Sequence, residues 1–309
     1  MDFLKNKNNE VTLFIQTPFK PRSIAELLGH FGLVELPFQL SEDPRWQFLT
    51  PHLKSCLSRT LMGIESRQGM VSVVGAYGSG KSMMVRRLVT ILDEDPDYDV
   101  QVIANPSYTG LQLLKLIGDL YGVSRKGTKL AQFDAFARYL MEAYQNNRHP
   151  VLLIDEAQLL SDGTRGNGGL PVLKQINNFS ALDEKSISIV LVGQETLRHN
   201  LARHPEIESR IFTSSTLDPL NREEVTDLVE FRLRVAGWGG APLFAPEALE
   251  ALYVGSRGVP RRVCTLAFNM MQAAFAEGAF FISGARAQEV VAREASNRGL
   301  NLEPAVMEE

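Results

Sequence analysis

Gly75-Ala76-Tyr77-Gly78-Ser79-Gly80-Lys81-Ser82 is the stretch of sequence that decides the fold. It matches the phosphate-loop pattern GxxxxGK[ST] at every fixed position. The apolar run Met70–Val74 precedes it, and helical spacing follows over Ser82–Asp93. Strand, glycine-rich loop and helix therefore come in the order that such a loop requires. This stretch predicts a site that binds the phosphates of a nucleotide.

The residue types in this loop suit that task. Glycines let the backbone curl so that several N–H groups point at the phosphates, and the following helix adds the positive end of its dipole. Lys81 is predicted to reach the β- and γ-phosphates, and Ser82 to hold Mg²⁺. The predicted ATP contacts in this segment are Gly75, Gly78, Ser79, Gly80, Lys81, Ser82 and Met83.

A second segment carries two carboxylates. The apolar run Val151–Ile154 ends in Asp155 and Glu156. Asp155 is predicted to hold the Mg²⁺ ion, directly or through water. Glu156 is predicted to orient and activate the attacking water. Strands often end in acidic turn residues, so the pair is informative mainly because it follows the phosphate loop.

Composition sets limits on the class of protein. A length of 309 residues predicts roughly one to two domains. The net charge of -4 and the pI of 5.8 argue weakly against nucleic-acid binding, since a local basic patch is compatible with an acidic whole. The two cysteines and five histidines form no metal-binding pattern. The N-terminus lacks a signal-peptide core and no apolar run is long enough to span a bilayer, so we expect a cytoplasmic protein without a membrane role.

The order of elements predicts the fold class. Short apolar strands alternate with helical segments up to about residue 217, which is typical of a parallel sheet covered by helices on both faces. Only helical patterns follow. We therefore predict an α/β P-loop NTPase sheet followed by a small all-helical lid domain. The expected limits are an N-terminal extension at 1–30, a nucleotide-binding αβα domain at 31–217, a helical lid at 218–300 and a disordered tail at 301–309.

Several unusual strings, together more specific than the phosphate loop, carry a family resemblance. The strings are His30-Phe31-Gly32-Leu33, Pro37-Phe38, Asp43-Pro44-Arg45, Gly63-Ile64, Asp155-Glu156-Ala157-Gln158, Leu191-Val192-Gly193-Gln194, Asp218-Pro219-Leu220, Glu223-Glu224, Phe231–Gly237 and Ser256–Arg261. Through them, over roughly residues 30–285, the chain resembles the AAA+ ATPases, and more narrowly the general-secretion-pathway A (ExeA-like) family, to which transposon target-selection ATPases are related.

The resemblance implies roles for further residues. Gln194 resembles the sensor that contacts the γ-phosphate or the water, the alternative being a strand cap. Arg210 resembles the arginine finger that a neighbouring subunit supplies, although Arg203 is also nearby. Arg261 resembles the second sensor, a role that Arg262 could share or take over. The segment Phe31–Phe38 is expected near the adenine.

Two features depart from the family pattern. Tyr77 is unusual within the phosphate loop. Residues 161–169, Ser-Asp-Gly-Thr-Arg-Gly-Asn-Gly-Gly, look like an insertion beyond the hydrolysis site. Such a glycine-rich loop is either a flexible surface loop or a nucleotide-dependent contact to DNA or a partner, with Arg165 as its one cation.

The leading functional hypothesis is an ATPase that assembles with ATP and Mg²⁺ into a ring or helical filament on duplex DNA and helps a transposase or integrase select its target. An arginine finger supplied between subunits makes a heterologous interface, which generates rings or open helices. DNA contact is expected to go to phosphates. The candidate cations are Lys126, Lys129, Arg165 and Lys174, each of which has a solvated surface charge as its alternative.

Two other functions remain open at this point. One is a nucleotide-dependent protein-assembly ATPase, of the secretion or envelope type, without a DNA role. The other is a small-molecule kinase. The pair Asp155 and Glu156 together with a helical lid favours an oligomeric ATPase over the kinase.

Overall fold

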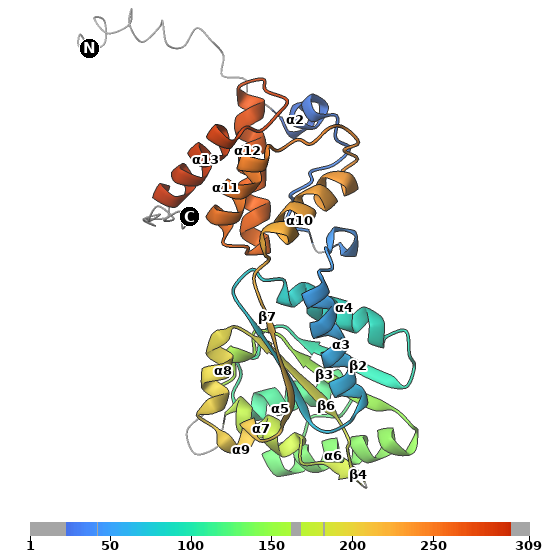
Figure 1. The fold of residues 1–309 in the computed structure, drawn as a ribbon. Helices are drawn as coiled ribbons and strands as arrows, with labels where there is room; N and C mark the ends of the chain where they lie inside the picture. Colours follow the sequence, from blue (N-terminus) through green and yellow to red (C-terminus); the bar gives the residue numbers. More distant parts are fainter. Residues whose placement is uncertain (1–22, 42, 162–167, 182, 298–309) are drawn as a thin grey trace, which may run out of the picture.

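Two units make up the part of the chain that the computed structural model describes, residues 23–41, 43–161, 168–181 and 183–297 (Figure 1). The lower unit is built on a parallel sheet with the strand order β2-β3-β6-β1-β7. Its strands are β1 (Met70–Gly75), β2 (Tyr98–Ile103), β3 (His149–Ile154), β6 (Ser188–Gly193) and β7 (Ile211–Leu217). A short ribbon of β4 (Ser180–Ala181) and β5 (Glu184–Lys185) lies outside this sheet.

Both faces of the sheet are covered by helices, as predicted. Alternate residues of a strand point to opposite faces. Val151 and Leu153 pack with residues of α3 (Pro51–Glu65) and α4 (Lys81–Leu92), whereas Leu152 and Ile154 pack with the helices of the other face. Those helices are α5 (Gly110–Leu120), α6 (Lys129–Gln145), α7 (Gly169–Ile176) and α8 (Glu195–Ala202), followed by the short α9 (Pro205–Glu208).

The strand β7 was not predicted. Its sequence, Ile-Phe-Thr-Ser-Ser-Thr-Leu, lacks the continuous apolar run of the central strands. It lies at an edge of the sheet, and among the described strands it pairs only with β1, with α3 packed against it. An edge strand is less completely buried than a central one, which explains its polar composition.

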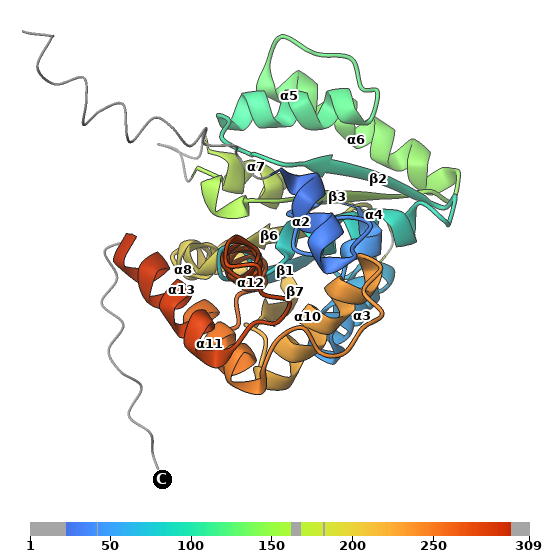
Figure 2. The same cartoon turned by 90° about the horizontal axis from the view of Figure 1, so that it is seen from above.

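The upper unit is helical. It contains α10 (Arg222–Val235), α11 (Pro246–Ser256), α12 (Pro260–Ala276) and α13 (Gly284–Asn297), which lie above the β1 and β7 side of the sheet (Figure 2). The helix α2 (Ile24–Phe31) and the 3-10 turn η1 (Pro44–Trp46) belong to the same packing, because Leu27, Phe31, Phe38 and Trp46 share a hydrophobic core with α10–α13.

The predicted domain limits stay predictions, but the packing of one segment differs from them. Residues 31–46 were assigned to the nucleotide-binding domain and contribute their buried side chains to the helical unit. The helix α2 begins inside the predicted N-terminal extension, with Ser23 as its N-cap in a capping box with Glu26. Residues 1–22 of that extension and the predicted tail 301–309 lie outside the described residues.

No helix among the described residues is long and apolar enough to cross a bilayer. The thiols Cys56 and Cys264 are both buried and free, and burial raises the pKa of each. A thiol with a raised pKa is a poor nucleophile at neutral pH. The cysteines are therefore part of the packing of their units.

A buried histidine makes stability depend on pH. His149 begins β3, and its Nε2 lies 2.8 Å from Ser188 Oγ. Burial lowers its pKa from 6.5 to about 4. The unfolded chain therefore binds a proton that the folded chain excludes, so stability falls as the pH drops from 6.5 towards 4. Between pH 7 and pH 5 we expect a loss of about 2 kcal/mol from this group in urea unfolding. The variant His149→Gln should lack this loss of unfolding free energy between pH 7 and pH 5. An unchanged dependence of its unfolding free energy on pH would contradict the assignment of the loss to His149.

Candidate functional site

The phosphate loop connects β1 to α4. β1 ends at Gly75, and α4 begins at Lys81 directly after Gly80, whose φ of 100° lies in the region that favours glycine. Gly78 also has a positive φ, 82°, and a Cβ at this position would lie 2.9 Å from Arg261 Cβ. Nothing lies within 4 Å of a Cβ built at Gly80, so the loop is open there. The geometry is that of a backbone cradle at a helix N-terminus, which suits an anion.

Lys81 is folded back onto this loop. Its Nζ donates to the carbonyl oxygens of Gly75 and Ala76 at 3.1 and 3.0 Å, and its side chain is almost completely buried. Burial lowers the pKa of Lys81, while the nearby carboxylates of Glu156 and Asp155 act in the opposite direction. The ammonium group is therefore held at the loop by two carbonyl dipoles, in a position from which it can turn to a bound phosphate.

Ser82, at the amino end of α4, meets Asp155, at the carboxyl end of β3. Ser82 Oγ, in the first turn of α4, donates to Asp155 Oδ2 at 2.7 Å, and Asp155 follows β3. A hydroxyl and a carboxylate are hard oxygen donors of the kind Mg²⁺ prefers, and Mg²⁺ usually keeps several waters. The pair therefore fits a magnesium ion shared with a nucleotide. Within the described ranges no group of three or more His, Cys, Asp or Glu side chains forms an alternative metal site.

Two glutamines connect Glu156, which lies just after β3, to the end of β6. Its backbone has a positive φ of 51°, and Gln194 Nε2, just after β6, donates to its Oε2 at 3.3 Å. Gln158 Nε2 donates to the same carboxylate oxygen, and Gln158 Oε1 accepts from the Gln194 backbone N–H at 3.0 Å. The structure thus brings Glu156 and Gln194 together, as the sequence reasoning expected. It adds Gln158, which was quoted in the family string but given no role.

The helical unit reaches the same loop through Arg261. Its backbone N–H donates to Gly78 O at 3.3 Å, and its Nη1 donates to the Tyr77 hydroxyl at 3.0 Å. The guanidinium carbon lies 5.5 Å from the centre of the Tyr77 ring. Arg262, the alternative second sensor, instead donates to Gly255 O at 2.8 Å. Of these two arginines, Arg261 is the one in contact with the phosphate loop.

Arg210 lies at the other end of the sheet. It precedes β7, and its carbonyl accepts from the N–H of Met70, the first residue of β1, whereas the phosphate loop follows the last residue of β1. Its Nε is buried and has no hydrogen-bond partner among the residues that the structure describes. Arg203 ends α8 and donates to Asn200 Oδ1 at 2.9 Å. The fold therefore does not bring Arg210 to the phosphate loop of its own chain.

Phe31 and Phe38, at the two ends of the segment expected near the adenine, are buried in the core of the helical unit. The placement of Phe31–Phe38 near the adenine stays a prediction. A cavity does adjoin the phosphate loop at Ser79, Gly80 and Met83. Its other walls come from the segment after Phe38 and from the start of the helical unit, namely Trp46, Gln47, Phe48, Thr50, His52, Leu53, Leu217, Asp218, Leu220, Leu228, Arg232 and Pro260.

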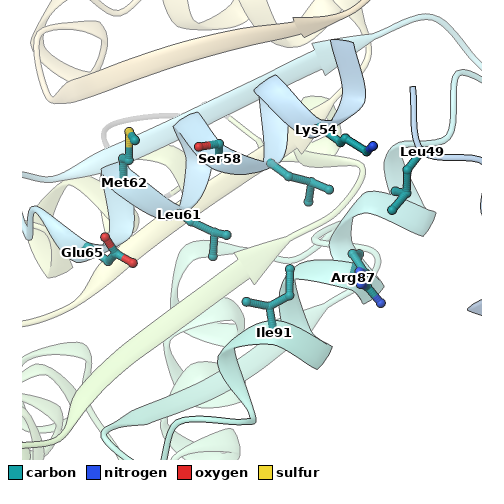
Figure 3. A pocket seen from close by; sticks show the side chains of 9 residues that line it. Leu49, Lys54, Ser58, Leu61, Met62, Glu65, Arg87 and Ile91 are labelled. Carbon is teal, nitrogen blue, oxygen red and sulfur yellow. The ribbon is translucent and has the colours of Figure 1, made fainter. Parts of the chain in front are cut away.

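A second hollow is chemically different. A groove of about 380 Å³ runs between α3 and α4, with Leu61 and Ile91 facing each other across it (Figure 3). Lys54 and Arg87 contribute the positive charges of its lining and Glu65 the negative charge. It contains neither a glycine-rich loop nor a carboxylate pair. The cavity at the phosphate loop is therefore the candidate functional site.

Known proteins support this assignment of the fold. Residues 64–201 match the family described as "AAA domain". The chain is 32% identical over 254 residues to general secretion pathway protein A of Aeromonas hydrophila, which covers 80% of this chain and 45% of that protein. The chain thus spans less than half the length of this relative.

Solved structures share the architecture at low sequence identity. Cdc6p from Pyrobaculum aerophilum superposes with a TM-score of 0.62 and 15% identity over 85% of this chain and 70% of that one. ORC1 of Aeropyrum pernix, solved in complex with DNA, superposes with a TM-score of 0.56 and 17% identity over 82% of this chain and 68% of that one. At such identities the likeness concerns the fold. Residues 64–201 therefore match an AAA domain, the fold is the AAA+ P-loop fold, and the chain is similar over 254 residues to general secretion pathway protein A.

Proposed function

We propose that the protein is an ATPase that works as an assembly on duplex DNA. The observation that carries the ATPase part is the convergence of Ser82, Asp155, Glu156 and Gln194 at one end of the sheet, beside the phosphate loop. Lys81 and the loop N–H groups would hold the phosphates, and Ser82 and Asp155 would hold Mg²⁺, which supplies charge neutralisation at the phosphates.

Hydrolysis in this proposal uses the chain's own groups as follows. Glu156 accepts the proton of a water in line with the terminal phosphate or orients that water. Gln194 and Gln158 keep the carboxylate in position through their amide N–H groups. Gln194 then senses the terminal phosphate, and Arg261 responds from the helical unit, which acts as a lid over the site.

We propose self-assembly because Arg210 is remote from the loop of its own chain. An arginine at that edge can serve as a finger only in the site of a neighbouring copy, where it neutralises charge in the transition state. Contacts of this kind join two different surfaces, so they produce rings or helical filaments with nucleotide at the subunit interfaces.

The DNA part rests on a structural neighbour and on lysine side chains. ORC1, of the same fold, has been solved in complex with DNA. Lys126 is exposed in the connection between α5 and α6, close in sequence to Lys129, which begins α6, whereas Lys174 lies on α7, near the carboxylate of Glu206. Arg165 lies outside the described residues. We propose that Lys126 and Lys129 contact phosphates, and that a transposase or integrase is the partner whose target site the assembly helps to select.

The test is duplex-DNA binding by Glu156→Gln with ATP and Mg²⁺, with ADP, and without nucleotide, at two salt concentrations. We expect binding only with ATP, weakening steeply at the higher salt as counterions are released. The double variant Lys126→Glu/Lys129→Glu should lose binding while keeping ATP affinity. DNA binding that ignores the nucleotide, or no binding in any state, would refute this role.

A second function is favoured by a separate observation. The homology with general secretion pathway protein A extends over 80% of this chain. This similarity supports a nucleotide-dependent protein-assembly ATPase of the secretion type without a DNA role, and the net charge of -4 fits that alternative. ATP-dependent oligomers that form equally well without DNA, and that do not bind it, would establish this function in place of the first.

A further inference from the structure

Tyr77 stands out among the residues of the phosphate loop. It is a large aromatic side chain, 67% exposed, in a loop that otherwise consists of small residues up to Lys81. An exposed aromatic contributes nothing to a cradle made of backbone N–H groups. Its side chain instead contacts the helical unit, through both the hydroxyl and the ring.

Arg261 is held at three points by the loop. Its Nη1 donates to the Tyr77 hydroxyl, its guanidinium lies over the Tyr77 ring, and its backbone N–H donates to Gly78 O. The Cα of Gly78 approaches so closely that an added Cβ would lie 2.9 Å from Arg261 Cβ and 3.2 Å from Val259 Cγ1. The start of α12 therefore packs on the phosphate loop, and the Tyr77 side chain contacts the Arg261 guanidinium with both its ring and its hydroxyl.

Free arginine side chains sample many rotamers, and ordering one costs conformational entropy. An arginine that is already oriented beside the phosphate loop loses less of that entropy when it contacts a phosphate. A cation–π contact and a hydrogen bond to a charged donor are both strong enough to bias such a side chain.

We propose that Tyr77 is a positioning residue for Arg261, which it orients so that the lid distinguishes ATP from ADP. This inference rests on the proposed function, because it assumes that the loop binds ATP. It adds a residue that the phosphate-loop pattern leaves unspecified. Tyr77 acts through Arg261, so its effect should exist only while the arginine is present.

The experiment is a double-mutant cycle read by nucleotide binding. Dissociation constants for ATP and ADP, each with Mg²⁺, are measured by displacement of a fluorescent nucleotide from the wild type, Tyr77→Ala, Arg261→Ala and the double variant. For Tyr77→Ala we expect ATP affinity to fall about fivefold to tenfold and ADP affinity to change less than twofold. Tyr77→Phe keeps the ring and should recover about half of the lost discrimination. In the Arg261→Ala background, Tyr77→Ala should have no further effect.

A matched control is present in the helical unit. Arg222, on α10, lies 4.9 Å from the centre of the ring of Tyr253, on α11. Tyr253→Ala removes a similar pair and should leave both nucleotide affinities within twofold. Equal losses for ATP and ADP, tighter ATP binding, or additive effects in the cycle would overturn the inference while the ATPase proposal stands. A wild type that binds neither nucleotide would overturn the proposed function, and the inference with it.

Discussion

Glu156→Gln is expected to lower the rate constant of ATP hydrolysis by about 10²-fold to 10⁴-fold, the range typical of a lost general base. Glutamine has nearly the same shape, and the positive φ of 51° at this residue is no harder for it to adopt. It lacks a group that can take a proton from water. ATP affinity should stay within about threefold, because Lys81 and the loop N–H groups are untouched. Phosphate release in single-turnover experiments measures the first effect, and fluorescent-nucleotide binding the second.

Gln158→Met supplies the comparison for this variant. It keeps the length of the side chain but removes both hydrogen bonds, one to Glu156 and one from the Gln194 N–H. We expect a loss of about 10-fold in the hydrolysis rate, smaller than that of Glu156→Gln, since the base is retained but held less firmly. A Glu156→Gln protein that hydrolyses ATP at the wild-type rate would remove Glu156 from the mechanism.

The second large effect is expected at Lys81. Lys81→Met should weaken ATP binding by about 100-fold or more, because a charge-assisted contact to the phosphates is lost from a buried position. Fluorescent-nucleotide titration measures this loss.

The same variant, Lys81→Met, should be at least as stable as the wild type in the absence of nucleotide. Burial lowers the pKa of Lys81, so its ammonium is less favourable in the folded chain than in water. Methionine has no charge to desolvate, and the unfolding midpoint of nucleotide-free Lys81→Met should therefore equal or exceed that of the wild type. Weak binding together with a lowered midpoint would indicate misfolding, and unchanged ATP binding would exclude Lys81 from the site.

The sequence alone was sufficient for the parts of the fold in which local pattern and tertiary role agree. Met70–Gly75 is buried on both faces, so its apolar run predicted a central strand, and the glycines after it predicted the loop. Val151–Ile154 followed the same rule and located Asp155 and Glu156. The helix predicted at Ser82–Asp93 is present as α4, Lys81–Leu92, because its helical spacing reflects its buried face.

Other parts depend on contacts between residues far apart in the chain. β7 is a strand because β1 offers it hydrogen bonds and α3 covers it, although its serines and threonines gave no apolar signal. The role of Gln158 depends on two partners, one of them 36 positions away. The contact of Tyr77 with Arg261 spans 184 positions. A pattern in one sequence indicates which face a residue presents, whereas it cannot indicate which residue of another element meets that face.

The packing of α2 and η1 against α10–α13 has a mechanical consequence. The chain passes between the two units twice, once after Trp46 on the way to α3 and again between Leu217 and Asn221. At the second passage Leu220 N donates to Gly258 O at 2.8 Å, and Gly258, with a φ of 68°, has its Cα against the Leu220 carbonyl. The two connecting segments define an axis. Because the helical unit is attached at both segments, it can rotate about this axis, whereas a unit with a single connection could rotate in every direction.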